Sequence, residues 1–552
     1  SDLTSVTNEQ MHKFLSKMED GYSFADEGIR NLLEGDFFSW YVWEEKWDFE
    51  LYSLIKELVS MIEDYTIYGS ENHLKSADVF KDLYIEIMPK AVRHSLGEYF
   101  TPAWLADSLI KEAISHNQPD DFVAVDPTCG SGIFLIAIIQ NIIAKHDIKD
   151  YTDEQKEELL FQILERVKGV DINPLSVLTA RVGYMLAISP LLTGNNVFEI
   201  PVYLGDSALT PKKELVEGVE CFKYDMASIQ SDINAIFPVK VVENKEEFSR
   251  LITFLAKLAK KGNEELLFEY LNESVIRNVG KTNTQLESRM RDMIDQIIAL
   301  NENGWNGLWV KVIGNFIKMA TINDVDVVIG NPPWVKWEFL PSTYAERIKA
   351  ISISRHLFSG QTYMGAISLN ICALIAHVTA TTWLKTTGVL AFLMPKTILT
   401  QDSYEGFRNF IIDEATDERF YLQKCVDWEK SGHPFIDMKE SFLSYIYKRD
   451  YVDYSKGLPL EFVTKKRGKQ SKNMRIINLE HSFEKVKNNF EFTQGKLVQV
   501  DNSRSGFTFV RDTKQVENFS KIIGYCAYKG RSGVEFTPKE VYMLKDGGND
   551  SS

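Results

Sequence analysis

Apolar residues recur at every third or fourth position through the first part of the chain, as in FELYSLIKELVSMIEDY at residues 49–65. This spacing gathers them on one face of an α-helix. Glycine and proline, which interrupt helices, are sparse up to about residue 92. The pattern therefore predicts a helical N-terminal domain over residues 1–92.

From about Asp121 the pattern changes to short β-branched runs that alternate with helical stretches. The runs that predict strands are FVAVD (122–126), VKGVDI (167–172), VYLGD (202–206), VDVVIG (325–330) and VLAFLMP (389–395). Strands that alternate with helices are typical of an α/β protein with a parallel, doubly wound sheet. We therefore predict a Rossmann-like, doubly wound α/β domain over residues 93–455.

A long stretch separates the third predicted strand from the fourth, and most of it has helical spacing, as in FSRLITFLAKLAKK at residues 248–261. A structureless loop of this length would be unusual inside a compact domain. We therefore predict a helical insertion over about residues 210–322. Residues 456–552 form a small C-terminal part.

The charge is unevenly distributed over the 552 residues. The net charge is −16, which by itself argues against a nucleic-acid partner. Residues 461–552, however, carry 17 basic and 11 acidic side chains, with the densest basic run at Lys465–Arg475. This part is compatible with contacts to phosphate, and Lys465, Lys466 and Arg467 are the candidate DNA-binding cations.

The chain shows no signal for a membrane or a metal. No apolar run approaches the length of about 20 residues that a membrane span needs, and the N-terminal residues lack the pattern of a signal peptide. The five cysteines are scattered, and no pair has zinc-ligand spacing. We therefore expect a cytoplasmic protein with no membrane partner and no metal.

The segment DPTCGSG, residues 126–132, follows the first predicted strand and opens a helix. Gly130 and Gly132 let the backbone turn tightly and approach a ligand, and the helix start supplies free N–H groups. The Gly-Lys-Ser/Thr of a nucleotide-phosphate loop and the GxGxxG of a dinucleotide site are both absent. The loop therefore indicates a ligand other than a nucleoside triphosphate or a dinucleotide.

Two more carboxylates end predicted strands. Asp171 ends the second and can accept hydrogen bonds from two ribose hydroxyls, and Asp206 ends the third, placed to accept from an adenine amino group. Each alone is more often an ordinary loop residue. Together with Asp126 they lie where α/β proteins bind ligands, and they predict a pocket for a nucleoside without phosphates.

The fourth predicted strand ends in Asn331-Pro332-Pro333-Trp334. Consecutive prolines make a rigid turn, but a turn alone requires neither the asparagine nor the aromatic residue. The Asn331 side-chain oxygen and the Pro332 carbonyl can both accept from one exocyclic amino group. Its nitrogen then becomes a better nucleophile toward an activated methyl group, while Trp334 offers a flat face for a base.

These motifs resemble those of the N6-adenine DNA methyltransferases of restriction-modification and phage-defence systems. The matching segments are, in chain order, GEYFTP (97–102), DPTCGSGIFL (126–135), GVDINPLS (169–176), YLGDSAL (203–209) and NPPW (331–334). Their order resembles the gamma arrangement, and the resemblance spans about Ala91 to Arg449. This arrangement implies target recognition C-terminal to the motifs, so residues 456–552 are a candidate start of a target-recognition domain. It implies methyl transfer from S-adenosylmethionine to N6 of adenine in double-stranded DNA after base flipping, with no metal required.

The resemblance also implies roles for individual residues. The implied cofactor site comprises Tyr99, Thr101, Pro102, Asp126, Pro127, Gly130, Ser131, Gly132, Asp171, Ile172, Asp206 and Asn331. Asn331, Pro332, Pro333 and Trp334 would hold the target adenine. His433-Pro434-Phe435, ahead of KESFLSYIYKR, resembles the later base-stacking loop of the family and nominates Phe435 for DNA binding, although a core phenylalanine before a strand would look the same.

Other functions remain open. A methyltransferase of RNA or of protein glutamine would also need an Asn-Pro-Pro-aromatic turn. Glu44-Glu45-Lys46 has the ExK form of a nuclease motif, but its context is helical. A catalytically inactive scaffold subunit is the third alternative, against which the intact NPPW argues. A specificity, nuclease or other defence-system subunit is an expected partner, and the chain is expected to be a fragment of a longer protein or to obtain specificity from such a partner.

Overall fold

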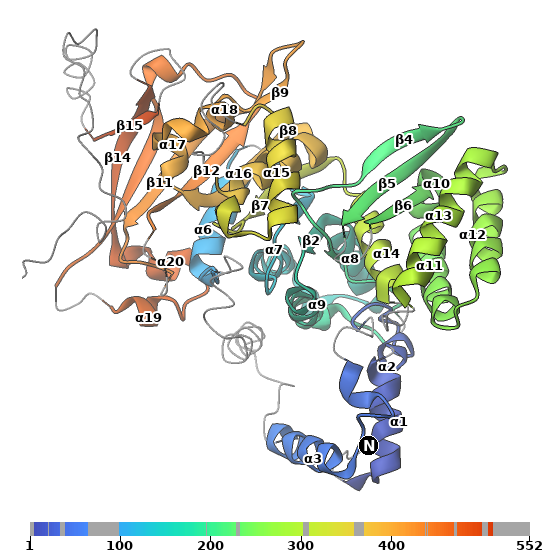
Figure 1. The fold of residues 1–552 in the computed structure, drawn as a ribbon. Coiled ribbons are helices and arrows are strands. Elements are labelled where there is room, and N and C mark those ends of the chain that lie inside the picture. Colours follow the sequence, from blue (N-terminus) through green and yellow to red (C-terminus); the bar gives the residue numbers. More distant parts are fainter. Residues whose placement is uncertain are drawn as a thin grey trace, which may run out of the picture.

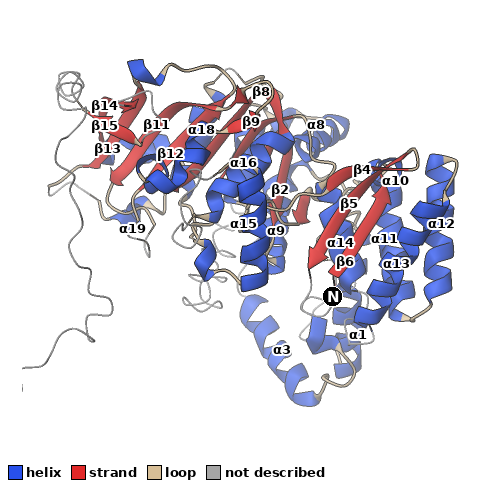
Figure 2. Cartoon of the chain, turned by 45° about the horizontal axis from the view of Figure 1, so that its top comes forward, coloured by secondary structure: helices blue, strands red, loops and turns tan. Residues whose placement is uncertain are grey.

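The computed structural model of the protein describes residues 5–19, 21–33, 39–63, 99–116, 118–194, 196–227, 232–301, 308–357, 369–435, 438, 440–468, 472–499 and 506–511. In this part of the chain a mixed sheet of ten strands forms the body of the molecule (Figure 1). A smaller sheet and a group of helices, drawn in green, lie beside one end of it. Helices cover the large sheet, which confirms the predicted α/β fold class (Figure 2).

The strand order of the large sheet is β15-β14-β13-β11-β12-β8-β7-β1-β2-β3. The strands are β1 (Ala124–Asp126), β2 (Val167–Asp171), β3 (Val202–Leu204), β7 (Val325–Gly330), β8 (Leu384–Pro395), β11 (Tyr421–Lys430), β12 (Phe442–Lys448), β13 (Leu458–Lys465), β14 (Phe490–Gln499) and β15 (Phe507–Val510). The five predicted strands correspond to β1, β2, β3, β7 and β8, which run parallel. The sheet is mixed because β12 lies antiparallel between β8 and β11.

The order of the parallel strands reverses at β1. The chain passes outward from β1 through β2 to β3, and then returns to place β7 on the other side of β1. This reversal is a topological switch point, and α/β sheets bind ligands outside the carboxyl ends of the strands at such a point. The first and fourth predicted strands therefore end next to each other.

Helices pack against the parallel strands. The helices of this region are α6 (Ala103–Ile114), α7 (Ile133–Ile143), α8 (Asp153–Arg166), α9 (Pro174–Ile188) and α16 (Ile371–Trp383). Helix α7 packs between α6 and α9, while α16 packs against β7 and β8. The apolar residues on most sides of α7 are buried, which explains the nearly continuous apolar run IFLIAIIQNII.

One apolar segment is longer than the sequence analysis expected. Within the described residues, Pro174–Leu191, which joins α9 to the short turn η4 (Ser189–Leu191), is long and apolar enough by composition to cross a membrane. Half of it is buried inside the structure. Helix α9 contacts β2, β3 and α7, and Arg181 within it donates to the Val202 carbonyl of β3. These are the contacts of a core helix.

The insertion between β3 and β7 contains strands as well as the predicted helices. Strands β4 (Lys212–Val216), β5 (Val219–Ala227) and β6 (Asp232–Pro238) form an antiparallel sheet. The helices that follow are α10 (Val239–Glu243), α11 (Lys245–Lys260), α12 (Glu264–Val279), α13 (Thr284–Asn301) and α14 (Leu308–Met319). Glu217 and Gly218, both in the left-handed region, make the two-residue turn between β4 and β5. This turn was the sequence signal for a hairpin that the helical prediction missed.

The N-terminal part is helical, as predicted, within its described residues. It contains α1 (Asn8–Glu19), α2 (Tyr22–Ala25), η2 (Ser39–Val42) and α3 (Phe49–Glu63), at the bottom of Figure 1. A short stretch of it forms an isolated parallel bridge, Ile29 with Phe198, to the segment before β3. Phe198 donates to the Gly28 carbonyl at 2.9 Å, and Arg30 donates to the Phe198 carbonyl at 3.1 Å. The remainder, residues 64–92, lies outside the described residues.

The sheet continues past the domain boundary predicted at residue 455. Strand β13 pairs in parallel with β11, and β14 and β15 extend the sheet beyond it. The division of the chain into domains stays a prediction. Shorter elements are η3 (Ile148–Asp150), η5 (Trp337–Phe339), α15 (Ser342–Ser354), α17 (Thr397–Thr400), η6 (Asp402–Tyr404), α18 (Glu405–Asn409), β9 (Ile411–Asp413), β10 (Glu418–Arg419), η7 (Tyr454–Lys456), α19 (Met474–Ile477), α20 (Phe483–Val486) and η8 (Lys487–Asn489).

Candidate active site

Asp126 lies at the switch point, where β1 ends. Its side chain is 1% exposed, and its Oδ1 accepts the backbone N–H of Thr128 at 3.0 Å. Burial raises the pKa of this carboxyl well above its usual range, and the nearby Asp171 raises it further. Gly330 ends the adjacent β7, and a Cβ there would lie 2.6 Å from Asp126 Oδ1. Glycine therefore allows the ends of β1 and β7 to meet.

The glycine-rich loop is held by the carboxylate that ends the next strand. The N–H of Gly130 donates to Asp171 Oδ2 at 2.8 Å, and the N–H of Asn173 donates to Asp171 Oδ1 at 2.8 Å. Gly130 and Gly132 have φ of 52° and 85°, in the left-handed region that favours glycine. A Cβ on Gly132 would come within 3.2 Å of Ala180 in α9. Asp171 and the loop thus form one unit.

Three features of this unit and its surroundings are suited to a ligand. The space beside Gly130 is open, because a Cβ there would meet no atom within 4 Å. The hydroxyl of Thr128 is buried and has no partner in the described structure. Ile172, directly after Asp171, is an apolar side chain that is 57% exposed. An open glycine edge, an unpaired buried hydroxyl and an exposed apolar side chain lie where the sequence analysis expected a nucleoside.

Asp206, after β3, is 5% exposed and has two partners. Its Oδ1 accepts the N–H of Ala208 at 2.9 Å, and its Oδ2 accepts the hydroxyl of Tyr344 at 2.9 Å. Burial raises the pKa of Asp206, while these two hydrogen bonds act in the opposite direction. Tyr344 belongs to α15, and the sequence analysis did not select it. Its only sequence signal is its closeness to the NPPW segment.

Asn331 follows β7, and its side-chain amide is anchored at one end only. Its Nδ2 donates to the Tyr99 carbonyl at 3.3 Å and to Thr101 Oγ1 at 3.2 Å. The orientation of the amide is determined by Tyr99, because a carbonyl oxygen can only accept. Oδ1 of Asn331 is buried and has no hydrogen-bond partner within the described residues. A buried acceptor without a partner is costly, and it indicates a ligand that donates there.

The predicted base-stacking residues lie together but contact each other. The rings of Trp334 and Phe435 meet edge to face, with centroids 5.6 Å apart, and Phe435 is 3% exposed. Trp334 Nε1 donates to the Leu393 carbonyl at 3.2 Å. Phe442 also packs on Trp334 at a centroid distance of 5.6 Å. In this arrangement the rings form a core cluster, so a base between them would require one ring to move. Their stacking role stays a prediction.

The remaining predicted residues are distributed around this centre. Tyr99 and Thr101 contact Asn331, and Pro102 precedes α6. Pro127 accepts from Ser207 at 2.6 Å. Pro332, Pro333 and Ser131 belong to the turns described above, whereas Gly97 and Glu98 lie outside the described residues.

The candidate DNA-binding cations lie at the end of β13. Lys465 is half-buried, and Lys466 and Arg467 are exposed. Strands β8, β11 and β13 run in the same direction, so these cations share the carboxyl edge of the sheet with Asn331. The strand order places them four strands from β7, a lateral distance of about 19 Å.

The possible nuclease motif lies elsewhere. Glu44 and Lys46 are exposed in a turn between η2 and α3, and neither is part of a strand.

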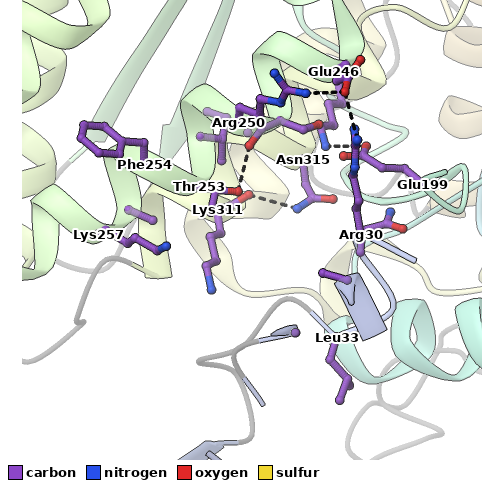
Figure 3. Close-up of a pocket in the computed structure, with 18 of the residues that line it drawn as sticks. Arg30, Leu33, Glu199, Glu246, Arg250, Thr253, Phe254, Lys257, Lys311 and Asn315 are labelled. Atoms are coloured by element: carbon purple, nitrogen blue, oxygen red, sulfur yellow. Dashed lines mark hydrogen bonds and ion pairs between the residues drawn. The ribbon is translucent and has the colours of Figure 1, made fainter. Parts of the chain in front are cut away.

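A cavity of about 630 Å³ lies between the N-terminal segment and the insertion helices α11 and α14 (Figure 3). Arg30 and Arg250 both pair with Glu246 at its wall, at 2.9 and 2.6 Å. Lys318 pairs with Glu199 at 2.9 Å. The described residues that line this cavity include none of the strand-end residues, so it is separate from the site at β1 and β7.

Solved structures and one family model resemble parts of the chain. A comparison with curated proteins gave no match. The solved structures that resemble the chain include a nuclease-deletion mutant of the Type ISP restriction-modification enzyme LlaGI in complex with a DNA substrate mimic (12% identity, 84% of this chain and 30% of that chain, TM-score 0.43). The type IIG restriction endonuclease BpuSI (14%, 92% and 40%, TM-score 0.41) and the M protein of the type I restriction enzyme EcoKI (12%, 94% and 91%, TM-score 0.34) are also similar.

The chain spans 25% to 40% of the length of the first four structures that it matches. A family model also matches part of the chain. The matched segment begins just before β2 and ends after β11. This segment contains Asp171, Asp206 and the NPPW turn, whereas the glycine-rich loop precedes it. Residues 165–431 match the family described as Eco57I restriction-modification methylase.

Proposed function

We propose that the protein is an S-adenosylmethionine-dependent methyltransferase that methylates N6 of adenine in double-stranded DNA, as part of a restriction-modification or phage-defence system. The observation that carries the proposal is the amide of Asn331, whose donor end is anchored and whose buried Oδ1 has no partner among the residues that the structure describes. The methylase family match over residues 165–431 supports the class of reaction.

An exocyclic amino group is the chemical partner that this amide best fits. Oδ1 of Asn331 can accept one amino proton, and the Pro332 carbonyl is the expected acceptor for the other. Withdrawing both protons from the ring plane localises the nitrogen lone pair. Because Nδ2 is engaged by Tyr99 and Thr101, the amide needs little reorganisation as charge develops on the attacking nitrogen.

The residues around the glycine loop fit S-adenosylmethionine. The open edge at Gly130 and the unpaired Thr128 hydroxyl would receive the amino-acid end, and Asp171 and Ile172 would hold the ribose and the adenine ring. Asp206 would accept from the adenine amino group. The bound cofactor would supply an activated methyl group, and the protein would orient the acceptor nitrogen toward it.

DNA is the proposed acceptor because the exposed cations after β13 share the carboxyl edge with Asn331. A target base within a duplex has to leave the stack to reach Asn331, which costs a few kcal/mol. A specificity, nuclease or other defence-system subunit is the proposed partner for restriction and for sequence recognition.

The test is methyl transfer from labelled S-adenosylmethionine to three acceptors in parallel: unmethylated double-stranded DNA, RNA, and a release-factor protein with a glutamine acceptor. We expect label in DNA, recovered as N6-methyladenine after digestion to nucleosides, with loss of the signal in Asn331→Ala. Label in RNA or in glutamine would support the alternative functions. Absence of cofactor binding by the wild-type protein would contradict the proposal as a whole.

A further inference from the structure

The helix α15 brings a buried hydroxyl to the carboxylate expected to recognise the cofactor's base. Tyr344 Oη donates to Asp206 Oδ2 at 2.9 Å, while Ala208 N–H occupies Oδ1 at 2.9 Å. Asp206 is 5% exposed, so water offers it little further solvation. The Tyr344 hydroxyl is therefore a side-chain donor to this carboxylate, beside the backbone N–H groups of Ala208 and Leu209.

The insertion helps to hold α15 over Asp206. Arg347, one turn after Tyr344 in α15, donates to the Asp225 carbonyl in β5. Tyr224, also in β5, is buried near Asp206. The groups that face Asp206 are thus Tyr344 and Arg347 from α15 and Tyr224 from β5. Because α15 follows the NPPW turn along the chain, it connects the base-binding end of β7 with the end of β3.

The Tyr344 hydroxyl affects whether the Asp206 carboxyl is ionised or neutral. Burial favours the neutral acid and raises the pKa of Asp206, whereas a hydrogen bond from Tyr344 favours the ionised form. An ionised carboxylate only accepts hydrogen bonds, but a neutral acid can also donate one. The amino group of adenine donates, and an oxo group at the same position accepts. An ionised Asp206 therefore distinguishes the two.

We propose that Tyr344 is a positioning residue that orients Asp206 and makes the cofactor site selective for an amino group rather than an oxo group on the purine. This inference rests on the proposed function, since it takes the adenine of S-adenosylmethionine as the ligand of Asp206. It gives α15, and the insertion that braces it, a role in recognition of the cofactor.

The experiment compares two stable ligands by calorimetry, S-adenosylhomocysteine and S-inosylhomocysteine. They differ in the amino or oxo group at position 6 of the purine and in N1, which carries a proton only in the oxo form. We expect the wild-type protein to prefer the amino form, and Tyr344→Phe to reduce the ratio of the two affinities about three- to tenfold. The matched control is Tyr184→Phe, which removes a buried hydroxyl that donates to Ile163 and Val167 in the core, and which should leave the ratio unchanged.

A second modified protein tests the inference if Tyr344→Phe does not fold. Incorporation of 3-fluorotyrosine at position 344 keeps the size of the ring nearly constant and makes the hydroxyl a stronger donor, so the preference for the amino form should increase. An unchanged ratio in Tyr344→Phe, or in the fluorinated protein if the first does not fold, overturns the inference while the proposed function stands. If the wild-type protein binds neither ligand, both the inference and the proposed function fail.

Discussion

Asp171 and Asn331 are two acceptors at the ends of the strands on either side of β1, and their hydrogen bonding is opposite. Both carboxylate oxygens of Asp171 accept backbone N–H groups of the chain itself, from Gly130 and Asn173. Oδ1 of Asn331 is buried and unpaired within the described residues, although its Nδ2 is held firmly. The first acceptor is part of the framework of its loop, and the second is reserved for a donor from outside.

The difference separates two kinds of functional residue. A side chain that also holds its own loop cannot be removed without affecting stability, so its contribution to binding is mixed with its contribution to folding. A side chain whose active atom has no partner in the protein can be removed with little loss of stability. The predictions below use this contrast, beginning with the largest effect.

Asn331→Ala should lower the rate of methyl transfer to DNA about 100- to 1000-fold, because it removes an acceptor that matters most in the transition state. The free energy of unfolding should change by only about 1 kcal/mol, because the substitution removes the two hydrogen bonds of Nδ2 together with a costly buried acceptor that has no partner within the described residues. Single-turnover assays and urea unfolding measure the two quantities. Asn489→Ala, which removes a remote amide that donates to Val486, is the control. A normal rate in Asn331→Ala would remove the basis of the contrast.

Asp171→Ala should affect both stability and binding. Two backbone N–H groups lose a charged acceptor, and the unfolding free energy should decrease by about 1.5–3 kcal/mol. Affinity for S-adenosylhomocysteine should decrease as well, because the Gly130 loop is no longer held. Thermal unfolding and calorimetry on the same sample measure these effects. If the variant loses affinity but keeps full stability, Asp171 is a ligand contact only and the contrast with Asn331 disappears.

Phe435→Leu tests whether the ring of Phe435 stacks on the target adenine. If Phe435 stacks on a flipped adenine, loss of its ring should lower the rate of DNA methylation about tenfold, from a stacking contribution of about 1–3 kcal/mol per base. Phe442→Leu is a closely matched control, because Phe442 lies at the same 5.6 Å centroid distance from Trp334. Both variants should lose similar stability. Equal rates in the two variants would make Phe435 a core residue.

Lys466→Gln and Arg467→Gln should produce the smallest effects. Each should weaken DNA binding uniformly over sequences and lower the slope of log affinity against log salt by about one. The slope is measured by titration of fluorescent duplexes at several salt concentrations. Unchanged slopes would place the DNA backbone away from the end of β13, while affinity for the cofactor should stay the same in either case.

The sequence predicted the elements whose signal is local. The five parallel strands were identified because each is a short apolar run that ends in a polar motif, as in VDVVIG before Asn331. The hairpin β4–β5 was missed because exposed charged residues such as Lys212 and Lys213 weaken its apolar pattern, leaving Glu217-Gly218 as the only turn signal. Strands β13 to β15 were not anticipated as part of the main sheet, because pairing over long sequence separations has no local signature.

Prediction of the candidate site from the sequence was also limited to residues in local motifs. Motifs identified Asp126, Asp171 and Asn331, whose positions follow from strand ends. Tyr344 was missed because its partner Asp206 is 138 positions away in the sequence, and no motif contains both residues. The unpaired state of Asn331 Oδ1 was equally inaccessible, since it depends on where Tyr99 and Thr101 hold Nδ2.

The short contact between residues 28–31 and the approach to β3 has a consequence for handling of the protein. Strand β3 ends the large sheet, and Asn31 exchanges two hydrogen bonds with Ile200 immediately before it, at 2.9 and 2.7 Å. Arg181 adds a third connection, from α9 to the Asn31 carbonyl at 2.9 Å. A chain truncated to begin at residue 93 would expose this margin of the sheet, and uncovered sheet edges pair with other chains. Such a fragment should aggregate during expression even though it retains every motif of the active site.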